Sequence, residues 1–459
     1  MKMRLLTGAV VAGMLSASTL SAAWTATGTA NEYTDGYWTI TRSGNTLSKV
    51  VAGGEVAADL DLTTFEADTG VKINRVGGEV CTSPLIASFT GPDVVHLDTK
   101  AFYKNTGITN LVLSSEWHQA WSYSEQFLNG CTNLENLEPK VIKWTTWSGP
   151  NLICNCPKLT IDVEFPLIEK ICGFRGVFAG AGFTSVSMPL YLGGICSRDE
   201  MFMNCKSLTR IDLPKAGTVE REFAKGCSSL EEVYMPSCTN FGYTGTFDGC
   251  SKLRKITIGK TLNKLPSSFL NGCTSLVSIE PFLPEGITDS GYDSGHFSWC
   301  GQGFQNCSSL EQPLVIKAPK LGKLEYKLFS NCAKISDITL DLPALTNIGI
   351  QVFGQIAAGA QIKWLSPNAP ETIDASAFYP RDGANPTVIL LRSREAATAW
   401  RKHCTRVRVP QAGETALTAN DLALASYPGD RTIGLIDVSW GSKAWIVRDW
   451  VDGTVILMR

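Results

Sequence analysis

The chain is poor in histidine and in charge of either sign, and these shortages exclude several classes of function. Only 4 of its 459 residues are His, 18% are charged, and the net charge is -2. Binding of nucleic acids or anionic membranes depends on clustered Lys and Arg, and no long basic run is present. We therefore expect no nucleic-acid partner. After the first residues no apolar stretch reaches the ~18 residues of a membrane helix, so we also expect no membrane insertion.

Motifs that carry chemistry are missing as well. The chain has no nucleophile elbow, no His-Glu-x-x-His and no paired glycine fingerprint after a strand. Cys154-x-Cys156 is not followed by a second pair at zinc-ligand spacing. We predict that the protein has no cofactor, no metal and no catalytic residues, and that it is not an enzyme.

The first residues have the order of an export signal. A positively charged end, an apolar run over residues 5–20 and the small residues Ser21-Ala22-Ala23 follow one another. A buried N-terminal helix is the alternative, but it would not require this order. We predict a signal peptide over residues 1–23 and a mature chain that begins near Trp24 and is secreted, periplasmic or displayed on the cell surface.

Eight of the 15 cysteines share one local context and mark a repeat. The residue before each is Gly or Asn, and an aliphatic residue follows three positions later. They are separated by 25, 49, 22, 23, 23, 34 and 25 residues, and they are Cys131, Cys156, Cys205, Cys227, Cys250, Cys273, Cys307 and Cys332. A repeat of 22 to 25 residues is implied.

Each unit predicts one short strand and one turn. Six residues after most of these cysteines, apolar and polar residues alternate, as around Ile211 and Leu213, which is typical of a strand with one buried face. A Phe usually stands three or four positions before the cysteine, and the Gly or Asn between them tolerates a positive φ. We infer a single helical turn that carries the Phe inward and ends in a left-handed cap. Units this small bury their apolar stripe only by stacking on one another.

This pattern resembles a known family. Phe-x-x-Gly/Asn-Cys-x-x-Leu-x-x-Ile-x-Leu-Pro, clearest in residues 202–214, 223–236 and 247–258, resembles the BspA-type leucine-rich repeats of exported and surface proteins of bacteria and some parasitic protists. The resemblance implies a leucine-rich-repeat solenoid of mostly short parallel strands with single helical turns. It also implies roles such as adhesion and the binding of proteins or host surfaces.

Two units depart from the pattern. The unit at Cys156 lacks its Phe, and its Ile161 does not fall on the position expected for the strand. In the unit at Cys307, Pro313 stands at that position. The register of these two units is therefore left open.

The flanks of the repeats predict caps. Residues 37–41 and 47–51 predict a hairpin near the start, 387–391 a strand, and 393–404 a helix capped by Ser393. With roughly ten units in the solenoid, the expected organisation is a signal peptide (1–23), a β-rich N-terminal cap (24–94), the solenoid (95–365), a C-terminal cap of a strand plus a helix (366–409) and a small β-rich segment (410–459). The last segment could be an accessory module, a surface-retention segment or part of the cap.

The repeat cysteines are predicted to be free. Equivalent cysteines on adjacent units come close enough for a disulfide, but their side chains point the same way into the core. We expect a column of buried thiols that act as small apolar side chains. The other seven have no common context and some could pair: Cys81, Cys154, Cys172, Cys196, Cys238, Cys300 and Cys404.

Three features are candidate ligand surfaces. The first is a strip of mixed charge with one aromatic residue on the strands, which suits a protein or a glycan and includes Arg210, Asp212, Glu232, Tyr234, Lys255 and Thr257. The second is an insertion in the 34-residue unit, either a binding loop or a tolerated polar loop, with candidates Asp289, Asp293, His296 and Trp299. The third is a tryptophan group, either an exposed platform or core: Trp117, Trp121, Trp144 and Trp147.

These features lead to one main hypothesis and two alternatives. The main hypothesis is an exported protein that presents a surface for a protein or glycan ligand, with adhesion as one such role. The alternative is a structural or self-associating scaffold of the cell envelope. A hydrolase is the third possibility, and it would need a clustered carboxylate or His pocket that the sequence does not display.

Overall fold

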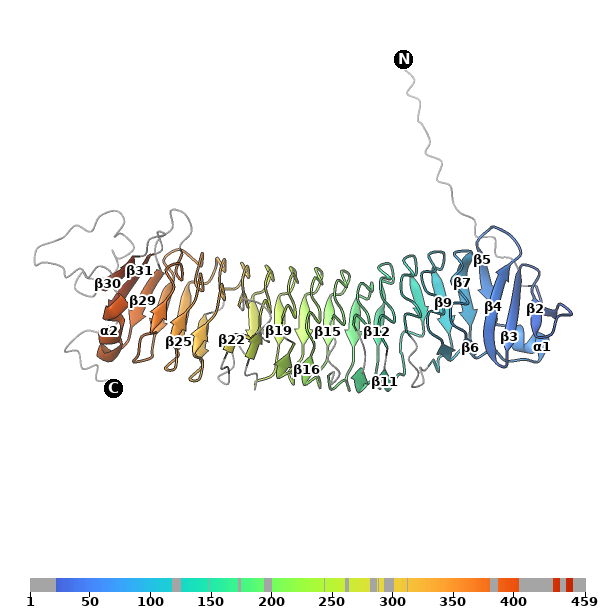
Figure 1. The fold of residues 1–459 in the computed structure, drawn as a ribbon, viewed down its shortest axis with the longest axis horizontal. Coiled ribbons are helices and arrows are strands. Elements are labelled where there is room, and N and C mark those ends of the chain that lie inside the picture. Colours follow the sequence, from blue (N-terminus) through green and yellow to red (C-terminus); the bar gives the residue numbers. More distant parts are fainter. Residues whose placement is uncertain are drawn as a thin grey trace, which may run out of the picture.

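The computed structural model is a long parallel β-solenoid whose coils follow one another along a single axis (Figure 1). The residues that it describes are 22–117, 125–147, 149–171, 175–193, 200–242, 244–260, 264–280, 287, 289–292, 301–311, 313–379, 387–403, 432–437 and 443–448. Regular structure in these ranges is mostly short strand; the helices are α1 (Phe65–Thr69), α2 (Arg394–Trp400) and the 3-10 helix η1 (Arg401–His403). Parallel strands with few helices confirm the predicted class of fold.

The N-terminal end is an antiparallel meander that passes into parallel pairing. Its strands are β1 (Thr25–Ala26), β2 (Glu32–Thr34), β3 (Trp38–Ser43), β4 (Thr46–Ala52), β6 (Arg75–Val76) and β8 (His96–Leu97). β1 to β4 pair antiparallel in sequence order, so the predicted hairpin is confirmed by β3 and β4. β4 then pairs in parallel with β6, and β6 with β8.

Each coil contributes one strand to what we call the strand side of the solenoid, where three sheets follow one another. The first contains β5 (Ala58–Asp61), β7 (Ile86–Gly91), β9 (Asn110–Leu113) and β10 (Asn136–Glu138). The second contains β12 (Asp162–Glu164), β14 (Ser185–Ser187), β15 (Arg210–Asp212), β17 (Glu232–Tyr234), β19 (Lys255–Thr257) and β21 (Ser278–Glu280). The third contains β23 (Leu314–Lys317), β25 (Asp337–Asp341), β27 (Gln361–Trp364), β29 (Thr387–Leu391), β31 (Lys443–Arg448) and β30 (Thr432–Asp437).

Shorter strands form a second column after the corner that ends each main strand. They pair in parallel within small sheets and are β11 (Thr146–Trp147) with β13 (Lys170–Ile171), β16 (Thr218–Val219) with β18 (Asn240–Phe241), β20 (Lys264–Pro266) with β22 (Asp289–Tyr292), and β24 (Lys323–Leu324), β26 (Asn347–Ile348) and β28 (Thr372–Ile373). The middle residue of each main strand in the second sheet is buried, and these residues lie opposite one another, as Ile211 and Val233 do. The alternation seen in the sequence is therefore a one-sided strand.

The opposite edge of each coil, which we call the turn side, contains two left-handed residues four positions apart in eleven coils. The second of each pair is the residue before the cysteine position, and all eight predicted Gly and Asn residues there have positive φ. The first left-handed residue is Gly in only two of these coils, so its positive φ could not be predicted from the sequence. These residues are Lys100, Gln126, Asn151, Gly176, Glu200, Glu222, Gly245, Ser268, Gln302, Lys327 and Gln351. Between the two, the Phe packs inward, and the amide of Cys205 closes one such turn by donating to the carbonyl of Phe202 over 3.1 Å.

Stacked phenylalanines connect the coils inside the core. Phe304, Phe329, Phe353 and Phe378 form a nearly parallel stack with ring centroids 5.4 to 5.9 Å apart. The corresponding Phe residues of the middle coils meet mostly edge to face, as Phe202 and Phe223 do at 5.3 Å. Since these rings pack on the rings of the neighbouring coils, the core depends on the stacking of coils.

Parallel pairing continues past both predicted ends of the solenoid, residues 95 and 365. It begins with β4 and β6 and continues through β29 to β31. At the C-terminal end the amide of Ala396 donates to the hydroxyl of Ser393 over 3.1 Å, which confirms the predicted helix cap, and Trp400 is buried. The antiparallel pair of β30 and β31 lies in the last predicted segment. The division into caps and solenoid remains a prediction about domains.

The strand side is interrupted twice, at the two units that depart from the repeat. β10 and β12 belong to different sheets, and so do β21 and β23. In regular coils the inward strand residue lies six residues after the cysteine, as Ile211 does after Cys205. In the two departing units it lies seven residues after the cysteine, at Val163 and Leu314. One extra residue thus accompanies each interruption.

The turn side is continuous through both interruptions. The amide of Gly130 donates to the carbonyl of Cys154 over 2.9 Å, across the first interruption. The amide of Gly272 donates to the carbonyl of Gln305 over 2.9 Å, across the second. At the first interruption β12 also keeps one parallel bridge to the preceding coil, between Val141 and Glu164, so the coils stay stacked where the strands leave the common sheet.

Candidate functional site

The outward residues of β12 to β21 form one surface, which we call the strand face. Parallel register places the six predicted strip residues on three adjacent strands, in two rows. Arg210, Glu232 and Lys255 lie side by side in one row, and Asp212, Tyr234 and Thr257 lie side by side in the other. The structure therefore brings together residues that are as many as 47 positions apart in the sequence.

Charges on the strand face pair with one another and leave an aromatic ring uncovered. The guanidinium of Arg210 contacts the carboxylate of Glu232 on the next strand and lies 3.3 Å from that of Asp212 on its own strand. These side chains are between a third and a half exposed, so the ion pairs contribute at most about 1 kcal/mol each. Tyr234 is 40% exposed and Lys255 is exposed beside them. Tyr and Arg are among the residue types that contribute most to binding at protein interfaces.

A groove opens at the edge of the strand face, between β10 and β12. The amides of Thr160 and Ile161 donate within their own coil, to the carbonyls of Lys158 and Leu159 over 2.8 and 3.0 Å. In regular coils the corresponding amides donate to the previous coil, as Glu231 does to Thr209. The groove is lined by Glu135, Asn136, Lys140, Pro157, Lys158, Thr160, Ile161, Asp162 and Thr184.

Asp162 is held in place at the edge of this groove. Its carboxylate accepts hydrogen bonds from the hydroxyls of Ser185 and Thr184, each at 2.6 Å. These donors favour the charged form and lower the pKa of Asp162 from its usual value. The repeat pattern did not predict the groove, although the irregular unit at Cys156 marks its position.

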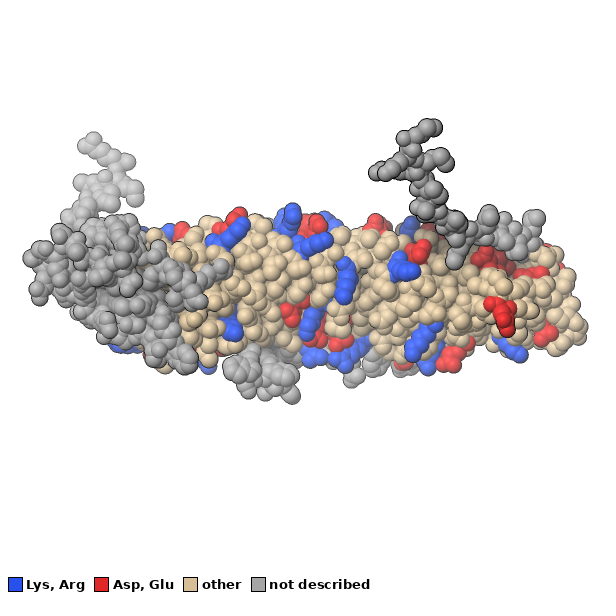
Figure 2. Space-filling view, turned by 90° about the horizontal axis from the view of Figure 1, so that it is seen from above, with Lys and Arg blue, Asp and Glu red and all other residues tan. Residues whose placement is uncertain are grey.

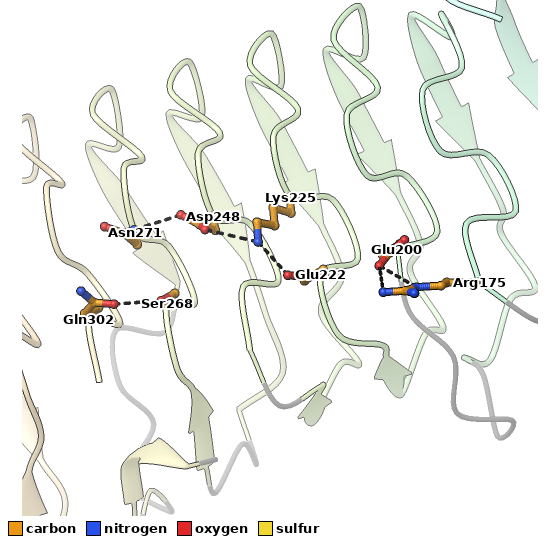
Figure 3. Close-up of polar contacts among 8 residues, drawn as sticks. All are labelled: Arg175, Glu200, Glu222, Lys225, Asp248, Ser268, Asn271 and Gln302. Atoms are coloured by element: carbon orange, nitrogen blue, oxygen red, sulfur yellow. Dashed lines mark hydrogen bonds and ion pairs between the residues drawn. The ribbon is translucent and has the colours of Figure 1, made fainter. Parts of the chain in front are cut away.

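A row of polar contacts lies on the turn side, most of them between neighbouring coils (Figure 3). Arg175 pairs with Glu200 at 2.7 Å, and Lys225 pairs with Glu222 at 2.7 Å and with Asp248 at 4.0 Å. The row continues from Asp248, which accepts from the amide of Asn271 over 3.0 Å, to a contact between Ser268 and Gln302 at 3.3 Å. Burial raises the pKa of Asp248, against the opposing effect of Lys225. Because these groups satisfy one another, we assign the row to coil stacking.

The repeat cysteines are buried and free, as predicted. All eleven cysteines among the described residues are free thiols. The thiol of each repeat cysteine also donates to a backbone carbonyl of an earlier coil, over 3.0 to 3.3 Å in all eight cases. The thiol is thus a hydrogen-bond donor as well as a small apolar group. Ala181 takes this position in the coil between Cys156 and Cys205, where its amide closes the turn on Phe178 at 3.0 Å.

The tryptophan group belongs to the core where the structure describes it. Trp117 and Trp144 are buried and meet edge to face with ring centroids 5.1 Å apart. Trp121 lies outside the described residues, and of Trp147 only the backbone, in β11, is described. Packing therefore explains the two that can be placed.

The insertion is described only in part. Asp289 begins β22, which pairs with β20, and its side chain is not described. Asp293, His296 and Trp299 lie outside the described residues. These four residues remain predictions.

The surface carries both signs of charge in small groups. On the face shown in Figure 2, Lys and Arg lie interspersed with Asp and Glu on a largely uncharged surface. Among the described residues, no helix combines the length and the apolar character needed to cross a membrane. The same residues contain no group of three or more His, Cys, Asp or Glu side chains placed to hold a metal ion.

In-register strands, one inward turn per coil and a shared core define a solenoid repeat protein. Residues 175–301 and 298–383 match the family model described as BspA type leucine rich repeat region, in six copies. This match confirms the resemblance to the BspA-type leucine-rich repeats over residues 175–383. A repeat region of this family supports a role as a binding protein or repeat scaffold. None of the curated proteins matches the chain.

Solved structures of other leucine-rich-repeat proteins are similar at low identity. A leucine rich cell surface protein from Faecalibacterium prausnitzii A2-165 is 19% identical, covers 67% of this chain and 94% of its own, and has a TM-score of 0.32. A leucine-rich repeat protein from Bacteroides ovatus ATCC 8483 is 16% identical, covers 71% of this chain and 92% of its own, and has a TM-score of 0.36. Because these TM-scores are low, we take no argument from the two structures, and the description of the fold depends on the strand register of this chain.

Proposed function

We propose that this chain is an exported, non-enzymatic binding protein whose ligand is another protein, held on the strand face. The observation that carries the proposal is the pair of rows on β15, β17 and β19, which present Arg210, Tyr234 and Lys255 on a rigid sheet. Protein interfaces are enriched in Tyr and Arg and tolerate both signs of charge at the rim. A mixed row of this kind suits a protein partner better than a polyanion.

Export is part of the proposal. Residues 1–23 have the order of a signal peptide, and members of the matched family are typically secreted or displayed on the surface of bacteria. Adhesion is the role that such a location suggests for a strand-face ligand.

The experiment first isolates a protein ligand and then measures its affinity for the wild type and for variants of the strand face. The chain from Trp24 is immobilised, surface proteins that it retains are purified, and the affinity of each is measured for the wild type and for Arg210→Ala and Tyr234→Ala variants. We expect each substitution to weaken binding at least ~10-fold, because truncation of a central Tyr or Arg typically costs about 2 kcal/mol. Lys206→Ala is the matched control, since Lys206 is exposed on the turn side.

Three outcomes would contradict the proposal. Equal affinities for the Tyr234→Ala and Lys206→Ala variants would remove the strand face from the binding site. Retention of glycans but of no protein, on a parallel glycan array, would assign the ligand to the other class. Concentration-dependent sedimentation without any other ligand would favour the self-associating scaffold.

A further inference from the structure

The buried part of the chain begins at Trp24. The Trp24 side chain is 2% exposed, and its ring meets Phe65 of α1 edge to face with centroids 5.5 Å apart. Its indole nitrogen donates to the backbone carbonyl of Asp61 over 3.0 Å. Ala22 and Ala23, immediately before it, are exposed. Trp24 thus covers the N-terminal end of the core, and the change from exposed to buried chain falls at the Ala23–Trp24 bond.

The backbone nitrogen of Trp24 faces a carboxylate. It lies 3.0 Å from Oδ2 of Asp68, in α1, and the same oxygen accepts a hydrogen bond from the hydroxyl of Thr64 over 2.7 Å. While Ala23 is attached, this nitrogen is a neutral amide. Once the bond between Ala23 and Trp24 is cut, the nitrogen is an α-amine, which is protonated near neutral pH.

The surroundings favour the added positive charge. The ionisable groups on the elements around Trp24 include the carboxylates of Asp61, Glu66 and Asp68 and the ammonium of Lys72. Lys72 lies 3.7 Å from Glu66 and 2.6 Å from Asp93, so its charge is already balanced. Asp61 accepts from the hydroxyl of Thr63. Asp68 is the carboxylate that a cation at Trp24 would meet.

We infer that removal of the leader completes the N-terminal closure of the solenoid, because hydrolysis of the Ala23–Trp24 bond turns the contact with Asp68 into an ion pair. Water adds across the peptide bond, Ala23 leaves with a carboxylate, and Trp24 keeps the amine and gains a proton. The small residues Ser21-Ala22-Ala23 supply the recognition that such a cleavage needs. The inference rests on the export in the proposed function but not on the strand face.

The first test is the end of the exported protein itself. N-terminal sequencing or intact mass of the chain recovered outside the cytoplasm should give Trp24 as the first residue. Another first residue would overturn the assigned cleavage site and leave strand-face binding untouched.

The second test measures the ion pair. Two forms of the full chain are compared, one that starts at Trp24 with a free amine and one that retains Ala22 and Ala23, each with Asp68 and with Asp68→Asn. Hydrogen exchange of the amides in residues 25–34 reports opening of this end. We expect Asp68→Asn to speed exchange in the free-amine form by about two- to five-fold more than in the extended form, the range that an exposed ion pair supports. The control is Glu66→Gln, which removes a carboxylate from the same helix and should act equally on both forms.

The pH dependence supplies the independent readout. An α-ammonium that gains a carboxylate partner has a raised pKa in the folded state, so its stabilising effect is complete below about pH 7.7 and is lost as pH rises through the folded-state pKa. The extra protection of the free-amine form should therefore disappear by about pH 10. Equal effects of Asp68→Asn on both forms at pH 6 and at high pH would overturn the ion pair.

Discussion

The strand side and the turn side of the same coils respond differently to one extra residue. On the strand side the extra residue in the units at Cys156 and Cys307 separates β10 from β12 and β21 from β23. On the turn side the hydrogen bonds from coil to coil run through both places. The inward residues Val163 and Leu314 stay buried in these units, so the extra residue is accommodated between the turn and the strand, and what changes is the pairing with the preceding coil.

The difference shows where this solenoid can vary. The turn side keeps the coils stacked through hydrogen bonds that do not depend on the number of residues between turn and strand. The strand side can then open locally, as it does at the groove beside β12, without loss of the fold. We therefore expect differences in ligand binding between solenoids of this kind to come from changes on the strand side.

High pH should weaken the turn side and lower the free energy of unfolding, and we expect this effect to be larger than that of any single substitution or insertion below. Burial raises the pKa of the Cys154 thiol to about 12, and it also raises the pKa of Cys205, Cys250 and Cys273. In the unfolded chain a thiol ionises near pH ~8.5, so above that value the unfolded state releases protons that the folded state keeps. The free energy of unfolding should fall by about 1.4 kcal/mol per pH unit for each such thiol.

Urea unfolding between about pH 7 and pH 10.5 measures this slope. The stabilising contribution is complete below the unfolded-state pKa and decreases as pH rises toward the folded-state values. In a Cys250→Ala variant the free energy of unfolding should fall less steeply with pH, by the contribution of one thiol, about 1.4 kcal/mol per pH unit. A midpoint that stays constant to about pH 10 would show that the thiols are not closed off from water.

An insertion in a regular coil should reproduce the natural interruption. One Gly placed between Glu231 and Glu232 moves Val233 to seven residues after Cys227. We expect β17 to separate from β15 and the free energy of unfolding to fall by about 3 kcal/mol, since several hydrogen bonds of about 1 kcal/mol each are lost. Urea unfolding and hydrogen exchange of β15 and β17 provide the measurement.

The matched control inserts Gly between Thr160 and Ile161, whose amides already make no hydrogen bond to the preceding coil. The expected loss there is below about 1 kcal/mol, because these amides donate within their own coil. Similar losses at the two positions would mean that the interruption at β12 is not caused by the extra residue.

A single side chain on the turn side should have the smallest effect. Gly249 has a φ of 77°, and an added Cβ would meet its nearest atom, Cα of Gly226, only at 3.8 Å. There is room for the methyl group of Gly249→Ala, so only backbone strain opposes it, and we expect a loss of about 1 kcal/mol. Gly249→Asn should lose less, since Asn is found at this position in other coils. Thermal unfolding of the two variants distinguishes strain from steric clash, and a larger loss for Asn than for Ala would point to a clash.

The positions that could be foreseen are those at which a residue type has a local physical reason. Gly and Asn before the cysteine tolerate a left-handed backbone, so this turn was recognised from the sequence. The other left-handed position holds residues such as Lys100, Glu222 and Gln302, which have no such tolerance. Their strain is offset by hydrogen bonds to the next coil, as from the amide of Glu222 to the carbonyl of Thr244 at 3.0 Å. No single coil contains that information.

Part of the candidate surface could likewise be predicted from the sequence, and part of it could not. The strip residues on β15, β17 and β19 were selected because their positions in the repeat are equivalent, and register made them neighbours. The groove at Asp162 was missed, because it depends on which amides of one coil fail to reach the coil before it. Trp117 and Trp144 could be read as platform or as core until burial assigned them to the core.

The sequence by itself determined the period of the coil, the inward Phe, the cysteine and the strand residue, because each follows from the preferences of residues within one repeat. Only the tertiary structure decided where strands pair or separate, which carbonyl each thiol reaches and how Trp24 covers the first coil. Those contacts join residues of different coils, and their energies depend on a neighbour that the local pattern does not contain.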